Sequence, residues 1–257
     1  MDARTGRATA EDALVQAGGD RPSAAPACRP RAAARGGKPT IAVLAVQGAF
    51  VEHERRLERL GCACIELRQR ADLARPFDGL VLPGGESTAQ AKLMRDLGML
   101  EPLRTRIASG LPTLGTCAGL ILLAERVTGD GPVPPPAGVE PNDRGAGACG
   151  MERRGAFATL PVTVRRNAYG RQLGSFRTLA PFGGEGEPSR TVAMTFIRAP
   201  RIESVRDGVR TLAAVDGVPA AVQAGSQIGC AFHPELEDSN AVYERFLALA
   251  ESARAAD

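Results

Sequence analysis

Histidine is scarce in this chain, occurring only twice in 257 residues, as His53 and His233. A metal site built mainly from histidine is therefore excluded, and a histidine acting as general base must be one of these two side chains. The six cysteines include no C-x-x-C pair, and several of them lie within apolar runs. Cysteines used in this way are typical of reduced thiols, so we expect a cytoplasmic protein.

The sequence also lacks a strong excess of charge and long apolar runs. A net charge of +3 gives no reason to expect nucleic acid as a partner. No run approaches the ~18 apolar residues of a membrane span, and the N-terminus lacks the apolar core of a secretory signal. We therefore expect neither a nucleic acid nor a membrane as partner. A hydrophobic content of 44% is that of an ordinary globular protein.

The first half of the chain alternates between two kinds of segment. Residues 1–38 have no hydrophobic period and much Ala, Arg, Gly and Pro, so we expect a disordered extension before a single domain over 39–253. Within that domain, continuous apolar runs predict strands at 40–48, 62–67, 78–85 and 111–116, and helical spacing predicts helices at 49–61, 88–98, 99–110 and 118–127. This alternation predicts a parallel α/β sheet with right-handed crossovers.

The second half has a different pattern. Residues 128–158 are rich in Pro and Gly, and we expect a long loop there. Short apolar segments with turns between them follow, and a last helix is expected at 240–254; the predicted strands are 159–164, 190–200, 210–217, 219–225 and 226–232. Their hairpin-like spacing predicts antiparallel strands that extend or flank the sheet.

Cys117 stands between two glycines where a predicted strand meets a predicted helix. Gly115, Cys117 and Gly119 have the G-x-C-x-G spacing of a nucleophile elbow, whose tight turn leaves no room for larger flanking side chains. The same stretch also fits a buried structural cysteine beside a glycine-rich turn, and by itself it favours neither interpretation.

His233 follows an apolar strand and precedes Pro234, which favours an extended backbone. Glu235, two residues on, can then lie on the same side, bond the imidazole and fix its tautomer. With Cys117 these residues would complete a nucleophile–base–acid triad at the carboxyl ends of the strands. His53, in contrast, lies in the charged segment "VEHERRLER", and we interpret it as a solvated surface residue.

Acyl transfer also needs backbone donors for an oxyanion. The N–H of Ala118, directly after the cysteine, is the natural first donor. A second donor should come from one of two glycine loops, and we name Gly48 of "QGA" and Gly85 of "PGGES" as candidates. A simple tight turn is the alternative role for the glycine pair.

Taken together, these motifs resemble a known family. "GTCAGLILLA" and "AFHPEL" are similar to the nucleophile and His/Glu motifs of class I glutamine amidotransferases, the triad type. More specifically, five ordered segments resemble the glutaminase subunits of two-component pyridoxal 5′-phosphate synthases: "VLAVQGAFVEH", "LPGGEST", "VRRNAYGRQ", "FIRAP" and "GCAFHPEL". The resemblance covers residues 41–250.

The resemblance implies a three-layer, flavodoxin-like fold with a mostly parallel sheet and antiparallel strands in its second half. It implies hydrolysis of L-glutamine to glutamate, with ammonia passed to a synthase subunit in a hetero-oligomeric complex that makes pyridoxal 5′-phosphate. No cofactor or metal is implied for this chain. The alternatives are a glutaminase serving another synthase and a non-catalytic binding subunit of the same fold.

Carried over by position, the resemblance makes Cys117, His233 and Glu235 the triad. It implies a glutamine site of six residues: Gly85, Glu86, Ser87, Arg166, Ile197 and Arg198. An amino-acid ligand carries both charge signs, so an arginine can bind its carboxylate and Glu86 its ammonium. The sequence does not decide which arginine makes that contact, and either could instead form a surface ion pair. The N-terminal extension and the long loop depart from the family pattern.

Overall fold

The computed structural model describes residues 37–129, 154–166 and 175–256. Nearly all of the disordered extension predicted at 1–38 and most of the loop predicted at 128–158 lie outside these ranges, so both stay predictions. None of the described helices has the length and the apolar run that a membrane crossing requires.

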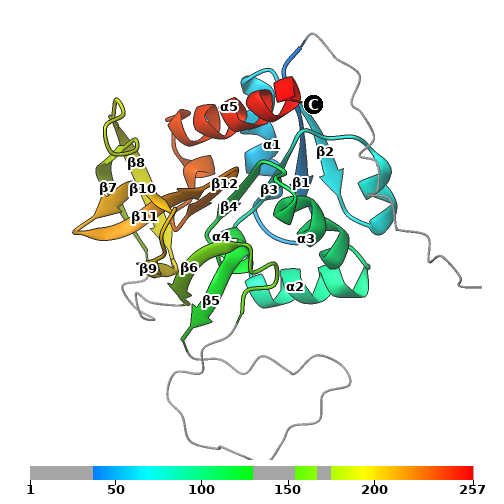
Figure 1. Cartoon of the computed structure of the whole chain (residues 1–257), viewed down its shortest axis with the longest axis horizontal. Coiled ribbons are helices and arrows are strands. Elements are labelled where there is room, and N and C mark those ends of the chain that lie inside the picture. Colours follow the sequence, from blue (N-terminus) through cyan, green and yellow to red (C-terminus); the bar gives the residue numbers. More distant parts are fainter. Residues whose placement is uncertain (1–36, 130–153, 167–174, 257) are drawn as a thin grey trace, which may run out of the picture. The chain divides into compact units, whose positions relative to one another are not determined.

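A seven-stranded sheet forms the centre of the described fold (Figure 1). Its strand order is β10-β11-β12-β4-β3-β1-β2, and the five strands from β12 to β2 are parallel. β11 and β10 continue the sheet as antiparallel strands. The bounds are β1 Thr40–Leu44, β2 Ala63–Leu67, β3 Gly79–Leu82, β4 Thr113–Thr116, β10 Arg210–Val215, β11 Val218–Ala224 and β12 Gln227–Cys230.

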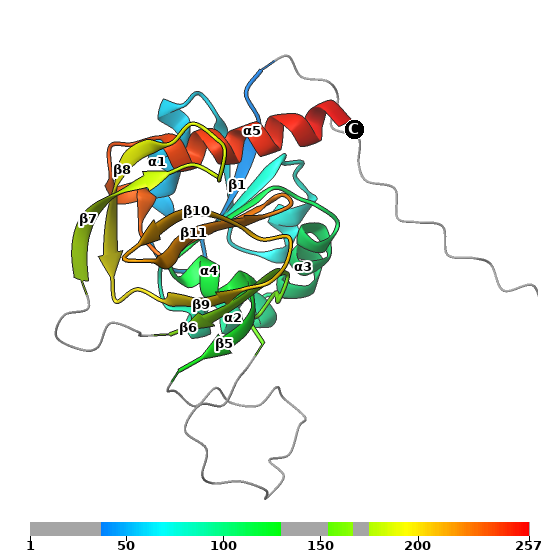
Figure 2. The ribbon, with the colours of Figure 1, turned by 60° about the vertical axis from the view of Figure 1, so that its left-hand side comes forward.

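Helices cover both faces of this sheet (Figures 1 and 2). α1 and α5 lie on one face, and α2, α3 and α4 lie on the other. From β1 the chain crosses to β2 at one edge of the sheet, and from β3 it crosses in the opposite direction to β4. Because such crossovers are right-handed, α1 lies on the opposite face from α2 and α3. The parallel strands are buried on both sides, which explains their continuous apolar runs. The bounds are α1 Phe50–Arg59, α2 Ser87–Asp96, α3 Leu100–Ala108, α4 Ala118–Leu123 and α5 Ala241–Ala256.

Two smaller sheets and two short 3-10 helices complete the described fold. One sheet has the order β5-β6-β9, and the other is the antiparallel pair β7-β8. The predicted mixture of a parallel sheet with later antiparallel strands is therefore confirmed. The bounds are β5 Ala124–Thr128, β6 Leu160–Arg165, β7 Ser175–Phe182, β8 Arg190–Ile197, β9 Arg201–Val205, η1 Arg70–Ala74 and η2 Pro234–Leu236.

Several elements differ from the prediction: the strand predicted at 40–48 ends at Leu44, for example, and β7 and β9 were not predicted. Two differences have a clear structural cause. The helix predicted at 118–127 ends at Leu123, because the residues that follow pair in parallel with the distant strand β6. The strand predicted at 190–200 ends at Ile197, where Arg198 adopts a positive φ of 44° and turns the chain toward β9. Both boundaries depend on tertiary pairing, which local spacing does not encode.

Candidate active site

The candidate residues gather at one edge of the main sheet. Cys117 directly follows β4, His233 lies just beyond β12, and Glu86 lies just beyond β3. These strands are parallel neighbours in the sheet, so their carboxyl ends meet at this edge. The fold therefore brings together motifs that are more than a hundred residues apart in the sequence.

Cys117 has the strained backbone of a nucleophile elbow. Its φ is +48° and its ψ is −99°, a conformation that costs free energy in a non-glycine residue. The turn is possible because Gly119 packs directly on β3: a Cβ there would lie 2.0 Å from the carbonyl oxygen of Leu82. The two glycines of the motif thus serve close packing, and the strain falls on the cysteine between them.

His233 bridges the cysteine and the acid. Its Nδ1 lies 2.6 Å from Oε1 of Glu235, and the two side chains are almost fully buried. Burial alone would lower the pKa of His233, but hydrogen bonding to Cys117 and Glu235 and their negative charge raise it to about 10. A pKa raised above neutrality favours the ring with both protons, and Nδ1–H donates to Oε1. A protonated imidazole beside a cysteine sulfur is typical of thiol nucleophiles.

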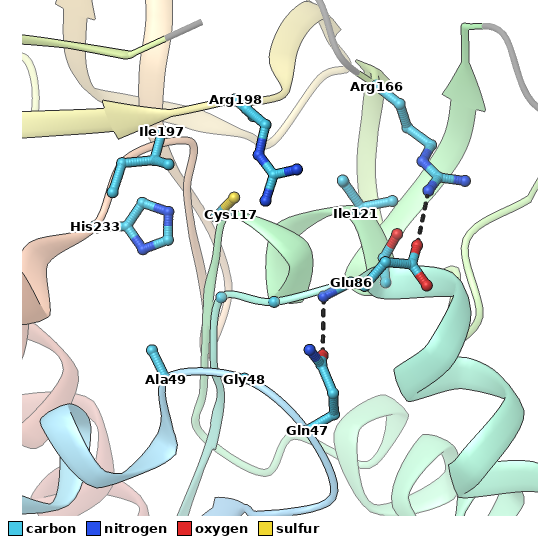
Figure 3. Close-up of a pocket in the computed structure, with 13 residues that line it drawn as sticks. Gln47, Gly48, Ala49, Glu86, Cys117, Ile121, Arg166, Ile197, Arg198 and His233 are labelled. Carbon is cyan, nitrogen blue, oxygen red and sulfur yellow. Dashed lines mark hydrogen bonds and ion pairs between the residues drawn. The ribbon is translucent and has the colours of Figure 1, made fainter.

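A cavity of about 350 Å³ opens in front of this pair (Figure 3). All six residues of the predicted glutamine site line it, together with Cys117, His233 and Gly48. Glu235 and Ala118 do not line the cavity; both are buried behind it. Within the described ranges, no cluster of three or more His, Cys, Asp or Glu side chains could hold a metal ion.

Two side chains of opposite charge pair at the cavity wall. Nη2 of Arg166 lies 3.1 Å from Oε1 of Glu86, as the dashed line in Figure 3 shows. The same carboxylate caps α2 by accepting the backbone N–H groups of Thr88 and Ala89. Burial raises the pKa of Glu86, but these backbone hydrogen bonds and Arg166 outweigh it, so the net shift is downward.

Arg198 is placed differently. It reaches the cavity from the end of β8, near Cys117 in the view of Figure 3. It forms no ion pair with any residue in the described ranges. Of the two predicted arginines, Arg198 is therefore the one whose guanidinium is not paired with a carboxylate of the described residues.

Four cavity residues were not predicted: Gln47, Ala49, Gly84 and Ile121. Gln47 accepts a hydrogen bond at Oε1 from the backbone N–H of Glu86, 2.9 Å away. It thereby joins the loop after β1 to the loop after β3. Its place beside Gly48 in "QGA" was visible in the sequence, but this contact requires that β1 and β3 be neighbours.

The interpretation of His53 as a surface residue is wrong. Its side chain has no exposed area, because α1 turns it toward the sheet. The sequence held a usable signal: His53 lies three residues after Phe50 and four before Leu57, on the apolar side of the helix. The many charged neighbours of His53 occupy mostly the opposite side.

Comparison with known proteins places this geometry in a class. A solved structure described as a glutamine amidotransferase superposes with a TM-score of 0.66 and 34% sequence identity, over 82% of this chain and 98% of that one. The predicted glutamine amidotransferase fold is confirmed. A family model, the SNO glutamine amidotransferase family, matches residues 43–134 and 148–252. The chain belongs to this family.

Relatives of high identity bear a more specific name. A Desulfitobacterium hafniense (strain Y51) protein named pyridoxal 5′-phosphate synthase subunit PdxT is 51% identical over 207 residues, covering 80% of this chain and 91% of the relative. A Methanocorpusculum labreanum protein of the same name is 46% identical over 209 residues, covering 81% of this chain and 96% of the relative. The resemblance found in the motifs thus extends over nearly the whole of these relatives.

Proposed function

We propose that this chain hydrolyses L-glutamine to L-glutamate and ammonia, and that the ammonia is passed to a synthase subunit making pyridoxal 5′-phosphate. One observation carries the hydrolytic part: a cysteine at a strained elbow shares the cavity with a histidine that is hydrogen-bonded to a buried glutamate. The relatives named as subunits of pyridoxal 5′-phosphate synthase support the biosynthetic part.

The chemistry follows from the placement of the three groups. The sulfur of Cys117 attacks the side-chain amide carbon of glutamine, and a C–S bond forms while negative charge develops on the amide oxygen. His233 then gives its proton to the leaving nitrogen, the C–N bond breaks, and ammonia departs. Next, His233 takes a proton from a water molecule, whose oxygen forms a C–O bond with the thioester carbon. The C–S bond then breaks, glutamate leaves, and the sulfur of Cys117 is free again. Throughout, Glu235 holds the imidazole orientation and stabilises its positive charge.

Backbone donors near the sulfur would stabilise the oxyanion. Ala118 is the first candidate, since its N–H directly follows the nucleophile. Gly48 and Gly85 are the candidates for the second donor, and both line the cavity. The side chain of Gln47 and the backbone of Gly84 hold these two loops together, since Gly84 accepts a hydrogen bond from the N–H of Ala49.

The charged groups of the cavity suit a zwitterionic ligand. We propose that Arg198 binds the α-carboxylate of glutamine, because its guanidinium is free of ion pairs within the described ranges. Glu86 binds the α-ammonium, and Arg166 fixes the position of the Glu86 carboxylate. Gly85, Ser87 and Ile197 supply the remaining walls of the site.

The proposal also concerns where the enzyme works. The four cysteines in the described ranges are all free thiols, which is consistent with a reducing compartment. We therefore propose a cytoplasmic enzyme whose partner is the synthase subunit.

Replacing the nucleophile tests the proposal. In the complex with the synthase subunit, Cys117→Ala should abolish pyridoxal 5′-phosphate formation from glutamine and leave formation from an ammonium salt intact. Cys64→Ala is the matched control, because Cys64 is a free thiol in β2 outside the cavity and should keep both activities. A Cys117→Ala complex still active with glutamine contradicts the proposal, as does a wild-type complex that releases no ammonia from glutamine.

A further inference from the structure

Both histidines of the chain approach one carboxylate. Oε1 of Glu235 binds Nδ1 of His233 at 2.6 Å, and Oε2 lies 3.4 Å from Nε2 of His53. Within the described residues Oε2 has no hydrogen bond, although it is fully buried, and the contact with His53 is long for one. A buried carboxylate oxygen without a hydrogen-bond donor destabilises the folded state. The group that faces Oε2 therefore determines how well the ionised Glu235 is stabilised.

The protons of His53 can be assigned from its surroundings. Its Nδ1 lies 2.8 Å from the hydroxyl of Tyr243 on α5, and its Nε2 lies 3.1 Å from Oγ1 of Thr116 on β4. If Nδ1 carried the proton, the lone pair of Nε2 would face the carboxylate of Glu235 and repel it. The reverse arrangement satisfies each group: Tyr243 donates its O–H to Nδ1, and Nε2–H points between Thr116 and Glu235.

We propose that His53 is a positioning residue of the catalytic triad, whose Nε2–H holds Oε2 of Glu235 and so keeps Oε1 directed at His233. This inference rests on the proposed glutaminase function. His53 does not reach the cavity, and it acts on the reaction only through Glu235. The triad would thus have a fourth member, located on the helix that follows β1.

The charges around His53 are consistent with a neutral donor. Burial lowers its pKa, and the attraction of Glu235 and Glu52 does not outweigh burial and the repulsion of His233. The Tyr243 phenol, whose pKa is raised by burial, remains protonated and able to donate. Burial also raises the pKa of Glu235, but the hydrogen bond and the charge of His233 oppose burial, and the net shift is downward.

Two substitutions at one position distinguish positioning from packing. The side-chain amide of His53→Gln can place an N–H near the site of Nε2, whereas His53→Phe fills similar space without a donor. In the complex with the synthase subunit, we expect His53→Phe to lower kcat for glutamine by roughly ten- to a hundredfold, the loss typical of a contact to a charged group, with little change in KM. His53→Gln should recover most of that rate.

The pH profile gives a readout that packing damage would not move. Burial raises the pKa of Glu235, and a hydrogen bond from Nε2–H of His53 counteracts this effect. Without that donor the pKa of Glu235 should rise. The acid limb of the pH profile of kcat/KM should therefore shift to higher pH in His53→Phe but not in His53→Gln. The pH dependence of Cys117 alkylation by iodoacetamide, followed by mass spectrometry of the Cys117 peptide, should shift in the same way. This second measurement needs no turnover.

The outcomes separate the two proposals. If the wild-type complex releases no ammonia from glutamine, the proposed function fails, and the alkylation profile alone decides the role of His53. If both variants lose activity equally without any shift of the acid limb, His53 only packs α1 against the sheet and the inference is overturned. An unchanged kcat and unchanged profiles in His53→Phe would overturn it as well. If His53→Phe does not fold, Tyr243→Phe serves instead. Without the hydroxyl donor, the proton of His53 is no longer held on Nε2, and the acid limb should shift less but in the same direction.

Discussion

Arg166 and Arg198 line the same cavity but have different surroundings. Arg166 is held against Glu86, which also caps α2, whereas Arg198 lies at the end of β8 with a positive φ of 44°. Because the side chain of Arg198 forms no ion pair in the described ranges, it can pair there with the carboxylate of a ligand. Arg166, in contrast, already has a partner and orients Glu86.

We expect Arg198→Gln to raise the KM for glutamine by roughly ten- to a hundredfold, the effect of losing a charged hydrogen bond to the substrate, and to change kcat much less. The measurement is steady-state ammonia release by the complex over a range of glutamine concentrations. Arg206→Gln is the matched control, since Arg206 pairs with Glu125 away from the cavity and should leave both constants unchanged. A large fall in kcat with KM unaltered would instead assign Arg198 to the reaction step.

At the scale of secondary structure, a cluster of charges joins three elements. Glu187, in the turn between β7 and β8, accepts hydrogen bonds from Arg245 of α5 and Arg210 of β10. The hydrogen bond from Arg245, together with that from the backbone N–H of Gly184, lowers the pKa of Glu187 from 4.5 to about 2. The hairpin β7-β8 is thus connected to the main sheet and to the last helix through one carboxylate.

This lowered pKa predicts a pH-dependent contribution to stability. The carboxylate stabilises the fold fully above pH 4.5, and the contribution is lost as the pH falls toward 2, because the folded state must then take up the proton. We therefore expect Glu187→Gln to lower the melting temperature at neutral pH, and the gap from wild type to narrow as the solution is acidified below pH 4.5. Thermal unfolding of both proteins at several pH values measures this gap. A gap that stays constant with pH would show that Glu187 contributes no charge-dependent stability.

Helices and strands that local residue spacing specifies could be predicted from the sequence. A strand that forms only by pairing with a distant segment could not. The α/β alternation up to β4 needs only apolar runs and helical periodicity, and these were present in the sequence. Residues 124–127 of β5 were predicted as the end of a helix because they directly follow an apolar stretch, and only pairing with β6 makes them a strand. The triad could be proposed because its glycines and proline impose local geometry. The burial of His53 depends on which side of α1 faces the sheet, and the many charges of that helix obscured it.

At the scale of the whole molecule, two loops that line the cavity are the parts through which a partner could act on the site. Gly48 has a φ of +104°, and a Cβ there would lie 1.9 Å from the carbonyl oxygen of Gly84. The loop after β1 therefore packs directly on the loop after β3, and both line the cavity. A small movement of either loop would change the direction of the backbone N–H groups near the sulfur of Cys117.

We accordingly expect the isolated chain to be a poor glutaminase that the synthase subunit activates. If one oxyanion donor is aligned only in the complex, turnover should rise by roughly 10²–10³, the effect of one such donor. The measurement compares ammonia release by the chain alone and with saturating synthase subunit. Equal rates would contradict this gating and leave the triad assignment unaffected.

The scarcity of histidine has a practical consequence for spectroscopy. Nitrogen-15 spectra of the imidazole region would contain signals from only two side chains, and both lie at Glu235. The two sets of signals can be told apart without mutagenesis, because one imidazole is hydrogen-bonded to the cysteine and the other is not. Titrating the labelled protein with glutamine, or with its partner, would therefore report protonation and tautomer at the reaction centre directly, without any added probe.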